Sequence, residues 1–510
     1  MSVIVNNTLY YGDNLDALRN RVRDETVDLC YIDPPFNSKR NYNQIYNNIG
    51  GEDRAQAQAF VDTWTWDDHA RDGYEEIIGN DKGRYPKQTV ALVKGLRDVL
   101  QFSPMLAYLV HMARRATEIH RVLKPTGSFY LHCDTTASHY LKIILDGIFC
   151  SQGGDFVNEV IWYYGPKATQ NASNFQRKHD TILFYSKGEF QFNTLLQQYS
   201  EGSLQERDTR YRHQDEDGRY RLTTRRDSDG HKYRAKVYLN DGVAMTDVWS
   251  IGVINATSRE RLGYPTQKPE ALLERIIKAS SNEGDVVLDA YCGCGTTVAV
   301  AQRLKRQWIG VDITYQSISL ILKRLSDTFG TAVSGDVVLS GVPRDIASAR
   351  ALAQKKDDRL RKEFEKWAVL TYTNNRAAVN GKKGADGGID GTTYFFSEKN
   401  KTDKMVFQVK SGHVSRGDIA KLKGDMEREQ AAMAALLTLE EPTGPMRSEA
   451  KAAGYYTHPF TGMRRDRIQI VTIQEILEQN KRIDLPLSMD VLKAAELALP
   501  GFEQTALNLQ

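Results

Sequence analysis

The tetrapeptide Asp33-Pro34-Pro35-Phe36 follows directly after the apolar run VDLCYI, which predicts a strand that ends at this point. In open α/β sheets, ligand chemistry gathers at the carboxyl ends of the strands. Consecutive prolines fix φ and remove two amide donors, so the Pro34 carbonyl is held beside the Asp33 carboxylate. An exocyclic amine that donates both hydrogens to these acceptors is pushed toward tetrahedral geometry, and Phe36 offers a face for stacking its ring. A strand-to-loop turn without chemistry is the alternative.

A second group, residues 289–297 with the sequence DAYCGCGTT, joins a predicted strand to a predicted helix. Glycines at such a turn let a ligand approach the backbone closely, and a helix N-terminus favours an anionic group. Asp312 ends the next apolar run, WIGVD, where an acidic residue suits ribose hydroxyls. Val298 stands where the dinucleotide fingerprint has its third glycine, so a tight turn without a ligand stays open. Cys292 and Cys294 lack a second ligand pair nearby, which favours buried thiols over a metal site.

Together these two groups resemble the amino-group DNA methyltransferases, which use S-adenosyl-L-methionine, over residues 5–325. In that family an Asp-Pro-Pro-aromatic motif performs catalysis, so the resemblance implies catalytic roles for Asp33, Pro34, Pro35 and Phe36. The catalytic motif precedes the cofactor loop, which is similar to the permuted β group. The implied fold is a circularly permuted, Rossmann-like α/β sheet. Asp rather than Ser before the prolines favours adenine N6 over cytosine N4, and N4 methylation stays an alternative.

The resemblance also implies a cofactor site. Residues 264–269 (YPTQKP) resemble a cofactor-adjacent motif, and Asp13 would lie near the adenine of the cofactor. Cys292 occupies the place of the family's usual aromatic residue, with Tyr291 before it. The residues expected to bind the cofactor are Asp13, Thr266, Lys268, Asp289, Tyr291, Cys292, Gly293, Gly295, Thr296 and Asp312.

Residues of about 165–255 lie where this group has its target-recognition region. Arginine and tyrosine alternate there, as in 210–212 and 219–221 (both RYR), and such side chains can contact phosphates and base edges. The pairs Asp217-Gly218 and Asp229-Gly230 predict turns. Because acidic residues are interleaved, a solvated hairpin of balanced charge is the alternative to DNA contact.

A third group begins at the Gly-rich turn 384–390, which delivers Asp390, and continues through a predicted strand to Gln408 and Lys410. Side chains at 408 and 410 face the same side of a strand because side chains alternate. One carboxylate, one further oxygen and one lysine can hold a hard divalent cation and orient a water, as phosphodiester hydrolysis requires. A solvated strand face is the alternative.

This third group resembles the Mrr-like branch of the PD-(D/E)xK restriction-endonuclease fold over residues 355–475. That branch has G-x-D-x-G-x-D followed by Q-x-K, as in GADGGID and QVK here. The resemblance implies catalytic roles for Asp390, Gln408 and Lys410. It also implies Mg²⁺ bound by Asp390 and Gln408, with Glu365 contributing from an upstream Phe-Glu element.

The length of 510 residues allows two to four domains at about 150 residues each. We expect the permuted methyltransferase in residues 1–330, a linker in 331–354 and the Mrr-like domain, a smaller α/β unit, in 355–510. The net charge of only +3 indicates that any basic patches that contact DNA are balanced by acidic patches elsewhere on the surface. No apolar run reaches the length of about 18 residues that a membrane span needs, and we expect a cytoplasmic protein without a membrane partner.

The sequence therefore predicts site-specific adenine-N6 methylation of double-stranded DNA, joined to a Mg²⁺-dependent endonuclease in restriction–modification or defence. In one alternative the C-terminal domain only binds DNA and has lost cleavage. In another, of a different class, both halves form a non-enzymatic DNA-binding regulator. A homodimer and separate restriction-system subunits stay open.

Overall fold

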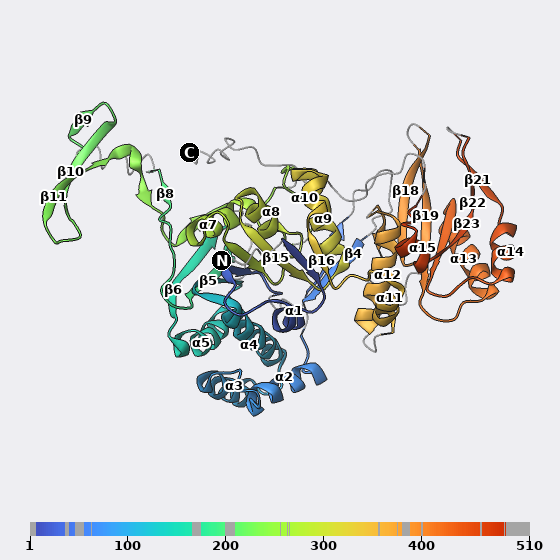
Figure 1. Ribbon diagram of the computed structural model, residues 1–510, viewed down its shortest axis with the longest axis horizontal. Helices are drawn as coiled ribbons and strands as arrows, with labels where there is room; N and C mark the ends of the chain where they lie inside the picture. The colour runs from blue at the N-terminus through green and yellow to red at the C-terminus, as the bar shows by residue number, and fades with distance from the viewer. Residues whose placement is uncertain are drawn as a thin grey trace.

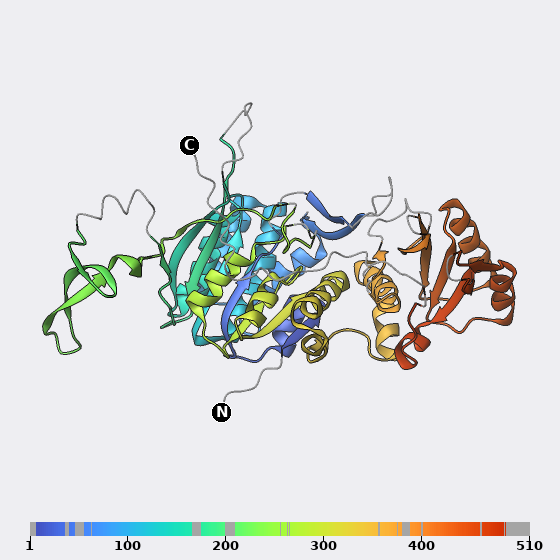
Figure 2. The same cartoon turned by 90° about the horizontal axis from the view of Figure 1, so that it is seen from above.

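The computed structural model describes most of the chain, which forms an elongated molecule (Figure 1). A finger of strands lies at one end, a large α/β unit in the middle and a smaller α/β unit at the other end (Figures 1 and 2). Phe36 and residues 384–387 of the third motif lie outside the described residues. The described residues are 7–35, 40–45, 56–62, 64–165, 175–198, 210–255, 257–262, 264, 266–354, 358–374, 376–379, 388–398, 401–459, 462–483 and 485.

A nine-stranded sheet forms the middle of the molecule, in the order β13-β6-β7-β5-β2-β14-β15-β1-β16. From β5 to β16 all neighbours are parallel, whereas β7 is antiparallel to both β5 and β6. This open, mostly parallel sheet is the Rossmann-like architecture expected from the sequence, and the β6–β7 pair adds an antiparallel edge. Its strands are β13 (Val248–Ser250), β6 (Asp155–Tyr163), β7 (His179–Ser186), β5 (Leu123–Cys133), β2 (Val27–Ile32), β14 (Val286–Asp289), β15 (Gln307–Asp312), β1 (Thr8–Tyr11) and β16 (Val338–Ser340).

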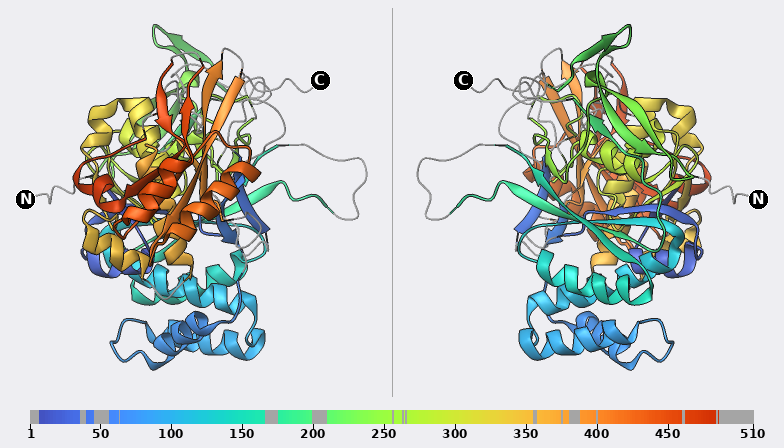
Figure 3. Two further views of the ribbon diagram at one scale, coloured as in Figure 1. Left: turned by 90° about the vertical axis from the view of Figure 1, so that its right-hand side faces the viewer. Right: turned by 90° about the vertical axis from the view of Figure 1, so that its left-hand side faces the viewer.

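Helices cover both faces of this sheet, which explains why its central strands are apolar almost throughout. Along β2, Cys30 and Ile32 pack with the helices of one face, and Leu29 and Tyr31 pack with those of the other. The first face holds α1 (Asn14–Arg21), α4 (Pro104–Val122) and α5 (Ser138–Ile148), with α2 (Asp68–Gly79) and α3 (Lys87–Leu100) as an outer layer (Figure 3). The second face holds α7 (Glu270–Ser280), α8 (Thr296–Arg303) and α9 (Tyr315–Phe329). The short helix η1 (Cys150–Gln152) follows α5.

The finger is a three-stranded antiparallel sheet within the predicted target-recognition region, and it projects from the large unit (Figures 1 and 2). Its strands β9 (His213–Asp215), β10 (Gly218–Arg226) and β11 (Lys232–Tyr238) turn where Asp217-Gly218 and Asp229-Gly230 predict. At its base, η2 (Leu239–Asp241) leads to the small ladder of β8 (Leu196–Gln197) with β12 (Val243–Ala244). A separate hairpin pairs β3 (Arg40–Ile45) with β4 (Gln56–Asp62).

The C-terminal unit is a five-stranded mixed sheet in the order β17-β18-β19-β20-β23. Helices α13 and α14 pack on one face of it and α12 on the other. The strands are β17 (Ala378–Val379), β18 (Gly391–Glu398), β19 (Lys401–Lys410), β20 (Met433–Thr438) and β23 (Ile468–Thr472), with a small ladder of β21 (Tyr455–Thr457) and β22 (Arg464–Asp466). The helices are α12 (Asp358–Tyr372), α13 (Arg416–Arg428), α14 (Gly444–Ala452) and α15 (Ile473–Glu478).

The segment predicted as a linker, residues 331–354, is folded. It forms α10 (Thr331–Gly335), β16 and α11 (Ile346–Ala353), and β16 pairs in parallel with β1 as the edge strand of the large sheet. Three residues are too short for a strand to show a period in the sequence, which is why this element escaped prediction. One apolar core continues from α9 of the large unit through α12 into the C-terminal sheet. Among the described residues, no helix has the length and apolar character needed to cross a membrane.

Candidate active site

Four predicted site carboxylates come from four neighbouring strands of the large sheet. Asp289 and Asp312 end β14 and β15, while Asp33 and Asp13 follow closely after β2 and β1. Because β2, β14, β15 and β1 are adjacent and parallel, the four residues lie along the carboxyl edge of the sheet. The fold thus brings together the first two groups of residues, which are far apart in the sequence.

Asp33 is paired with Lys268. The Lys268 ammonium donates to Asp33 Oδ2 at 2.5 Å and to the Thr266 carbonyl at 3.4 Å, and the lysine is only 9% exposed. Lys268 was expected to bind the cofactor, but the structure places its charge on the catalytic-motif carboxylate. Pro34 is buried beside it, and Thr266 is exposed with a positive φ of 61°.

The Gly-rich loop is fixed by its neighbours. Gly293 N–H donates to Asp312 Oδ2 at 2.9 Å, and Gly295 N–H donates to the Cys292 carbonyl at 2.7 Å. Gly295 has a φ of +74°, and a Cβ on it would lie 2.6 Å from Ile321 Cγ1. Only glycine fits that position without displacing the neighbouring helix, which explains why the turn has a glycine there.

Asp289 begins this loop and is buried, while Asp312 ends β15 and is half-buried. Burial raises the pKa of Asp289 to about 7, and the negative charges of Asp33 and Asp312 add to the shift. Burial also raises the pKa of Asp312 to about 6, although its bonds from Thr314 and Gly293 oppose the shift. A bound cation or hydroxyl donor would therefore stabilise the ionised form of each carboxylate. A cationic cofactor with ribose hydroxyls supplies both kinds of group.

Two of the predicted cofactor residues are already engaged in holding α1 and α4. Asp13 caps α1 through the N–H of Leu15, at 2.9 Å, and forms an ion pair with Arg115 at 2.7 Å. Tyr291 exchanges a hydrogen bond with His111 on α4 at 2.8 Å between the hydroxyl and Nε2. Sequence reasoning missed Arg115 and His111, because a basic or aromatic residue on an amphipathic helix has no distinguishing pattern.

The remaining predicted residues of the loop are buried. Cys292 and Cys294 are free thiols inside the core. Thr296 begins α8 and accepts a hydrogen bond from Arg324 at 3.2 Å. Tyr264, from the YPTQKP segment, lies against the loop, since a Cβ on Gly293 would come 3.3 Å from its ring.

The third group gathers at one edge of the C-terminal sheet. Asp390 accepts a hydrogen bond from the Val409 N–H at 2.7 Å, and its pKa is raised to about 7 by burial and by the charge of Glu365. Burial likewise raises the pKa of Glu365, against the charges of nearby cations that include Lys410. Asp390 and Glu365 together could share a divalent cation, since each is a buried acid that a cation would stabilise.

The other two members of that group are turned to protein partners. Gln408 is buried and donates its amide to the Gly388 carbonyl at 2.9 Å, while Lys410 faces Asp418 at 3.5 Å. Among the Asp, Glu, His and Cys side chains of the described part of the chain, Asp227, Asp229 and His231, at the exposed β10–β11 turn, lie close enough together to hold a metal ion. The Gln408 Oε1 atom, which would be the metal ligand of the third group, is buried without a hydrogen-bond partner among the described residues, and the set of Asp390, Gln408 and Glu365 stays a prediction.

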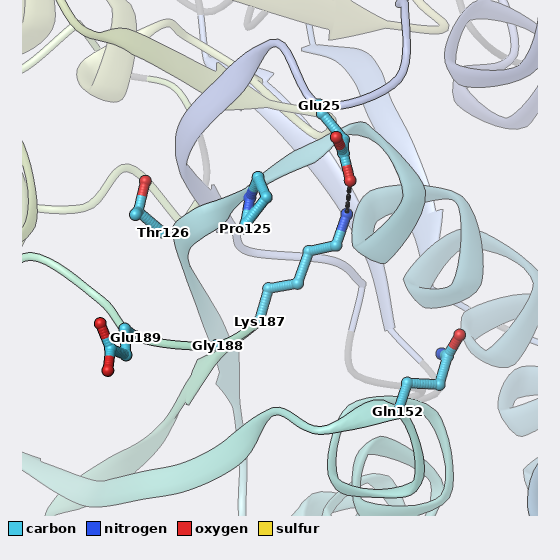
Figure 4. A pocket seen from close by; sticks show the side chains of 7 residues that line it. All are labelled: Glu25, Pro125, Thr126, Gln152, Lys187, Gly188 and Glu189. Carbon is cyan, nitrogen blue, oxygen red and sulfur yellow. Dashed lines mark hydrogen bonds and ion pairs between the residues drawn. The ribbon is translucent and has the colours of Figure 1, made fainter.

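A shallow pocket lies on the large unit, but at the opposite edge of the sheet (Figure 4). Pro125 and Thr126, near the start of β5, line it together with the ion pair of Glu25 and Lys187, whose charged atoms are 3.3 Å apart. Since Asp33 and Asp289 lie at the carboxyl ends of their strands, this pocket is separate from the carboxylate edge.

The chain is similar to known DNA methylases over its large unit. The model of the N6/N4 methyltransferase family, described as DNA methylase, matches residues 27–323. The type II methyltransferase M.HpaI of Haemophilus parainfluenzae is 31% identical over 230 residues, which are 45% of this chain and 63% of that protein, less than two thirds of its length. The DNA adenine methyltransferase YhdJ of Escherichia coli K12 is 26% identical and covers 62% of this chain and 82% of YhdJ.

Two further comparisons concern the fold and the C-terminal unit. A DNA modification methylase of Thermus thermophilus, TTHA0409, aligns with 66% of this chain and 99% of its own at 17% identity, with a TM-score of 0.33. That likeness is weak, and the strand order itself establishes the fold of the large unit. Residues 360–478 match a family described as NACHT-associated inactive Restriction Endonuclease 1. The C-terminal unit is thus similar to a restriction-endonuclease-like family described as inactive, which does not confirm the Mrr-like branch that the sequence pattern indicated.

Proposed function

The chain belongs to the N6/N4 family of DNA methylases, and from this premise we propose that it transfers a methyl group from S-adenosylmethionine to adenine N6 in double-stranded DNA. The observation that supports this most is the adjacency of β2 and β14, which sets Asp33 of the Asp-Pro-Pro motif beside the loop of Asp289. The relative YhdJ is a DNA adenine methyltransferase, which favours adenine over cytosine as the base.

The cofactor supplies an electrophilic methyl group on a sulfonium centre. Asp312, half-buried at the end of β15, would accept ribose hydroxyls, and Asp289, buried at the end of β14, would offer its charge to the cationic part of the cofactor. The glycines of the 293–295 turn allow its close approach. The raised pKa values of both acids fit a cationic ligand, because binding it would stabilise their ionised forms.

The amine of the target base is unreachable in a stacked duplex, so the base must be flipped out of the helix. Lys268 occupies Oδ2 of Asp33, which leaves Oδ1 and the Pro34 carbonyl to accept the two amine hydrogens. These two acceptors orient the nitrogen lone pair toward the methyl group. Positioning of this kind supplies most of the catalysis, because it replaces a bimolecular encounter by a held geometry.

The test is modification mapping by long-read sequencing of DNA from cells that express the full chain. N6-methyladenine at a defined sequence supports the proposal. N4-methylcytosine in its place would show that the substrate is cytosine and not adenine. The Asp33→Ala variant should lose all modification while binding S-adenosylmethionine normally. Modification at the wild-type level by the Asp33→Ala variant would show that Asp33 has no catalytic role.

For the C-terminal unit we propose DNA binding, with Mg²⁺-dependent cleavage as a second candidate. Cleavage is favoured by the closeness of Asp390, Glu365 and Lys410, whose charges act on one another. Gln408 donates its amide nitrogen to the Gly388 carbonyl, and its buried Oε1 has no hydrogen-bond partner in the part of the chain that the structure describes, which leaves that oxygen for a metal ion. Incubation of the chain with unmodified DNA and Mg²⁺ decides between the two, since cleavage must disappear in Lys410→Ala.

A further inference from the structure

Three polar side chains, two of them buried and the third, Asp180, half-buried, form a hydrogen-bonded row near Asp33. The Tyr31 hydroxyl lies 2.9 Å from His132 Nδ1, and His132 Nε2 lies 3.2 Å from Asp180 Oδ2. Tyr31 and His132 are 1% and 0% exposed, so water does not compete for these bonds. The three residues come from β2, β5 and β7, which are adjacent in the large sheet. None of them belongs to a motif of the sequence.

The Asp180 end of this row has a defined donor and acceptor. An ionised carboxylate only accepts, so His132 Nε2 must carry the hydrogen that is donated to Asp180. The other ring nitrogen, Nδ1, shares a hydrogen with the Tyr31 hydroxyl. The two hydrogen bonds join the three side chains and orient the Asp180 carboxylate.

The row leads to Lys268. Although burial tends to raise the pKa of Asp180, the hydrogen bond and charge of His132 and the charge of Lys268 hold it below its ordinary value. Lys268 therefore lies within electrostatic reach of Asp180, and it donates to Asp33. It immediately precedes Pro269 and α7, the helix that covers the sheet face on which Tyr31 packs.

We propose that Asp180 and His132 are positioning residues, which hold the Lys268 ammonium against Oδ2 of Asp33 and so keep Oδ1 directed at the target amine. The inference rests on the proposed function, since it assigns these residues to the geometry of Asp33. Without the charge of Asp180, Lys268 can turn away, and the Asp33 carboxylate can rotate out of the geometry that transfer requires. Methyl transfer then slows although cofactor and DNA still bind.

The experiment measures the transfer of tritiated methyl groups from S-adenosylmethionine to unmodified genomic DNA by the full chain. Asp180→Asn and His132→Asn should each lower kcat by about 100-fold, with little change in the KM for DNA or in cofactor affinity measured by calorimetry. Tyr31→Phe removes one oxygen and should lower kcat by about tenfold, as the loss of a single hydrogen bond to His132 allows. The control is His120→Asn, which alters a buried histidine of α4 that packs on Phe149, far from the carboxylate edge.

A double-mutant cycle with Lys268→Met, followed under single-turnover conditions, tests whether Asp180 acts through Lys268. If it does, Asp180→Asn costs almost nothing further in the Lys268→Met background. Additive losses, a normal kcat in Asp180→Asn, or an equal loss of kcat in His120→Asn would each overturn the proposal. Should Asp180→Asn fail to fold, Tyr31→Phe decides, and a wild-type kcat in it counts against the row. Failure of the proposed function is distinct, because then the wild type transfers no methyl group or Asp33→Ala retains full activity.

Discussion

The backbone N–H of Tyr315 donates to Glu363 Oε2 at 3.0 Å, and this buried hydrogen bond joins the first turn of α9 to α12. Tyr315 follows Thr314, whose hydroxyl donates to Asp312 Oδ1 at 3.0 Å. A carboxylate at a helix N-terminus is favourable because the free N–H groups there carry partial positive charge. The C-terminal unit thus caps the helix that begins just after Asp312, the carboxylate expected to bind ribose.

Glu363→Gln should lower the free energy of unfolding by about 1–2 kcal/mol, because it removes a buried charge from the N-terminus of α9 and from the ion pair with Lys366. Urea denaturation measures the change. The matched control is Glu283→Gln, which breaks an exposed pair with Lys305 and should change stability by less than about 0.5 kcal/mol. Equal losses in the two variants would show that Glu363 has no capping role.

Gly295→Ala should destabilise the protein more than Gly284→Ala does. Both glycines have positive φ, +74° and +87°, so each alanine costs about 1–2 kcal/mol for the left-handed backbone. At Gly295 the added Cβ also meets Ile321, whereas at Gly284 it meets nothing within 4 Å. Thermal unfolding measures the difference, and calorimetry should show weaker S-adenosylmethionine binding for Gly295→Ala alone. Normal cofactor binding in that variant would show that the loop is not part of the cofactor site.

The affinity for S-adenosylmethionine should rise with pH. The pKa values of Asp289 and Asp312 are raised to about 7 and about 6, so both acids are partly protonated below neutrality in the free protein. Because a cationic ligand favours their ionised forms, binding tightens as the pH rises through that range and then levels off. Calorimetry from about pH 5.5 to 8 tests this, and Asp289→Asn should bind more weakly with a flatter profile. An affinity of the wild type that is independent of pH would contradict the assignment.

Asp289 and Asp312 should also make the stability of the folded protein depend on pH, but here a rise in pH lowers stability, whereas it strengthens cofactor binding. In the unfolded chain they titrate near the ordinary aspartate value of 3.8, below their folded values. Between about pH 4 and 7 the folded protein without cofactor therefore holds more protons than the unfolded chain, and its free energy of unfolding falls as the pH rises. Asp289→Asn should reduce this slope in urea denaturation measured at several pH values, and an unchanged slope would exclude Asp289 as a source.

The finger should contribute basic contacts to DNA. Arg225 and Arg226 are exposed on β10, and Arg226 lies directly opposite Lys232 on β11, so like charges meet across the strands. A polyanion relieves that repulsion. Arg225→Ala with Arg226→Ala should weaken duplex binding and reduce the logarithmic salt slope by about 2. Fluorescence anisotropy at several salt concentrations measures this, with Arg97→Ala on α3 as the control. An unchanged slope would favour the solvated-hairpin alternative.

Local patterns predicted the elements that have a strong period or a clear signal. The apolar runs that end at Asp289 and Asp312 are strands, and the chain turns at Asp217-Gly218 and Asp229-Gly230 between the strands of the finger. These elements follow from hydrophobic spacing, which neighbouring residues determine.

Contacts between distant residues could not be predicted in this way. The pairing of Lys268 with Asp33, and the row of Tyr31, His132 and Asp180, depend on which strands become neighbours in the sheet. Single polar residues at strand ends have no periodic signal.

The edge strand β16 has a consequence for how this chain can be recombined with others. Since Val338–Ser340 completes the large sheet beside β1, a fragment cut at residue 330 would leave the edge of β1 open to another strand. A second exposed surface would appear where α9 meets α12, because one apolar core runs through both. If a homologue receives the C-terminal unit of another protein, the contact between α9 and α12 must therefore be preserved. We expect the large unit and the C-terminal unit to be inherited together.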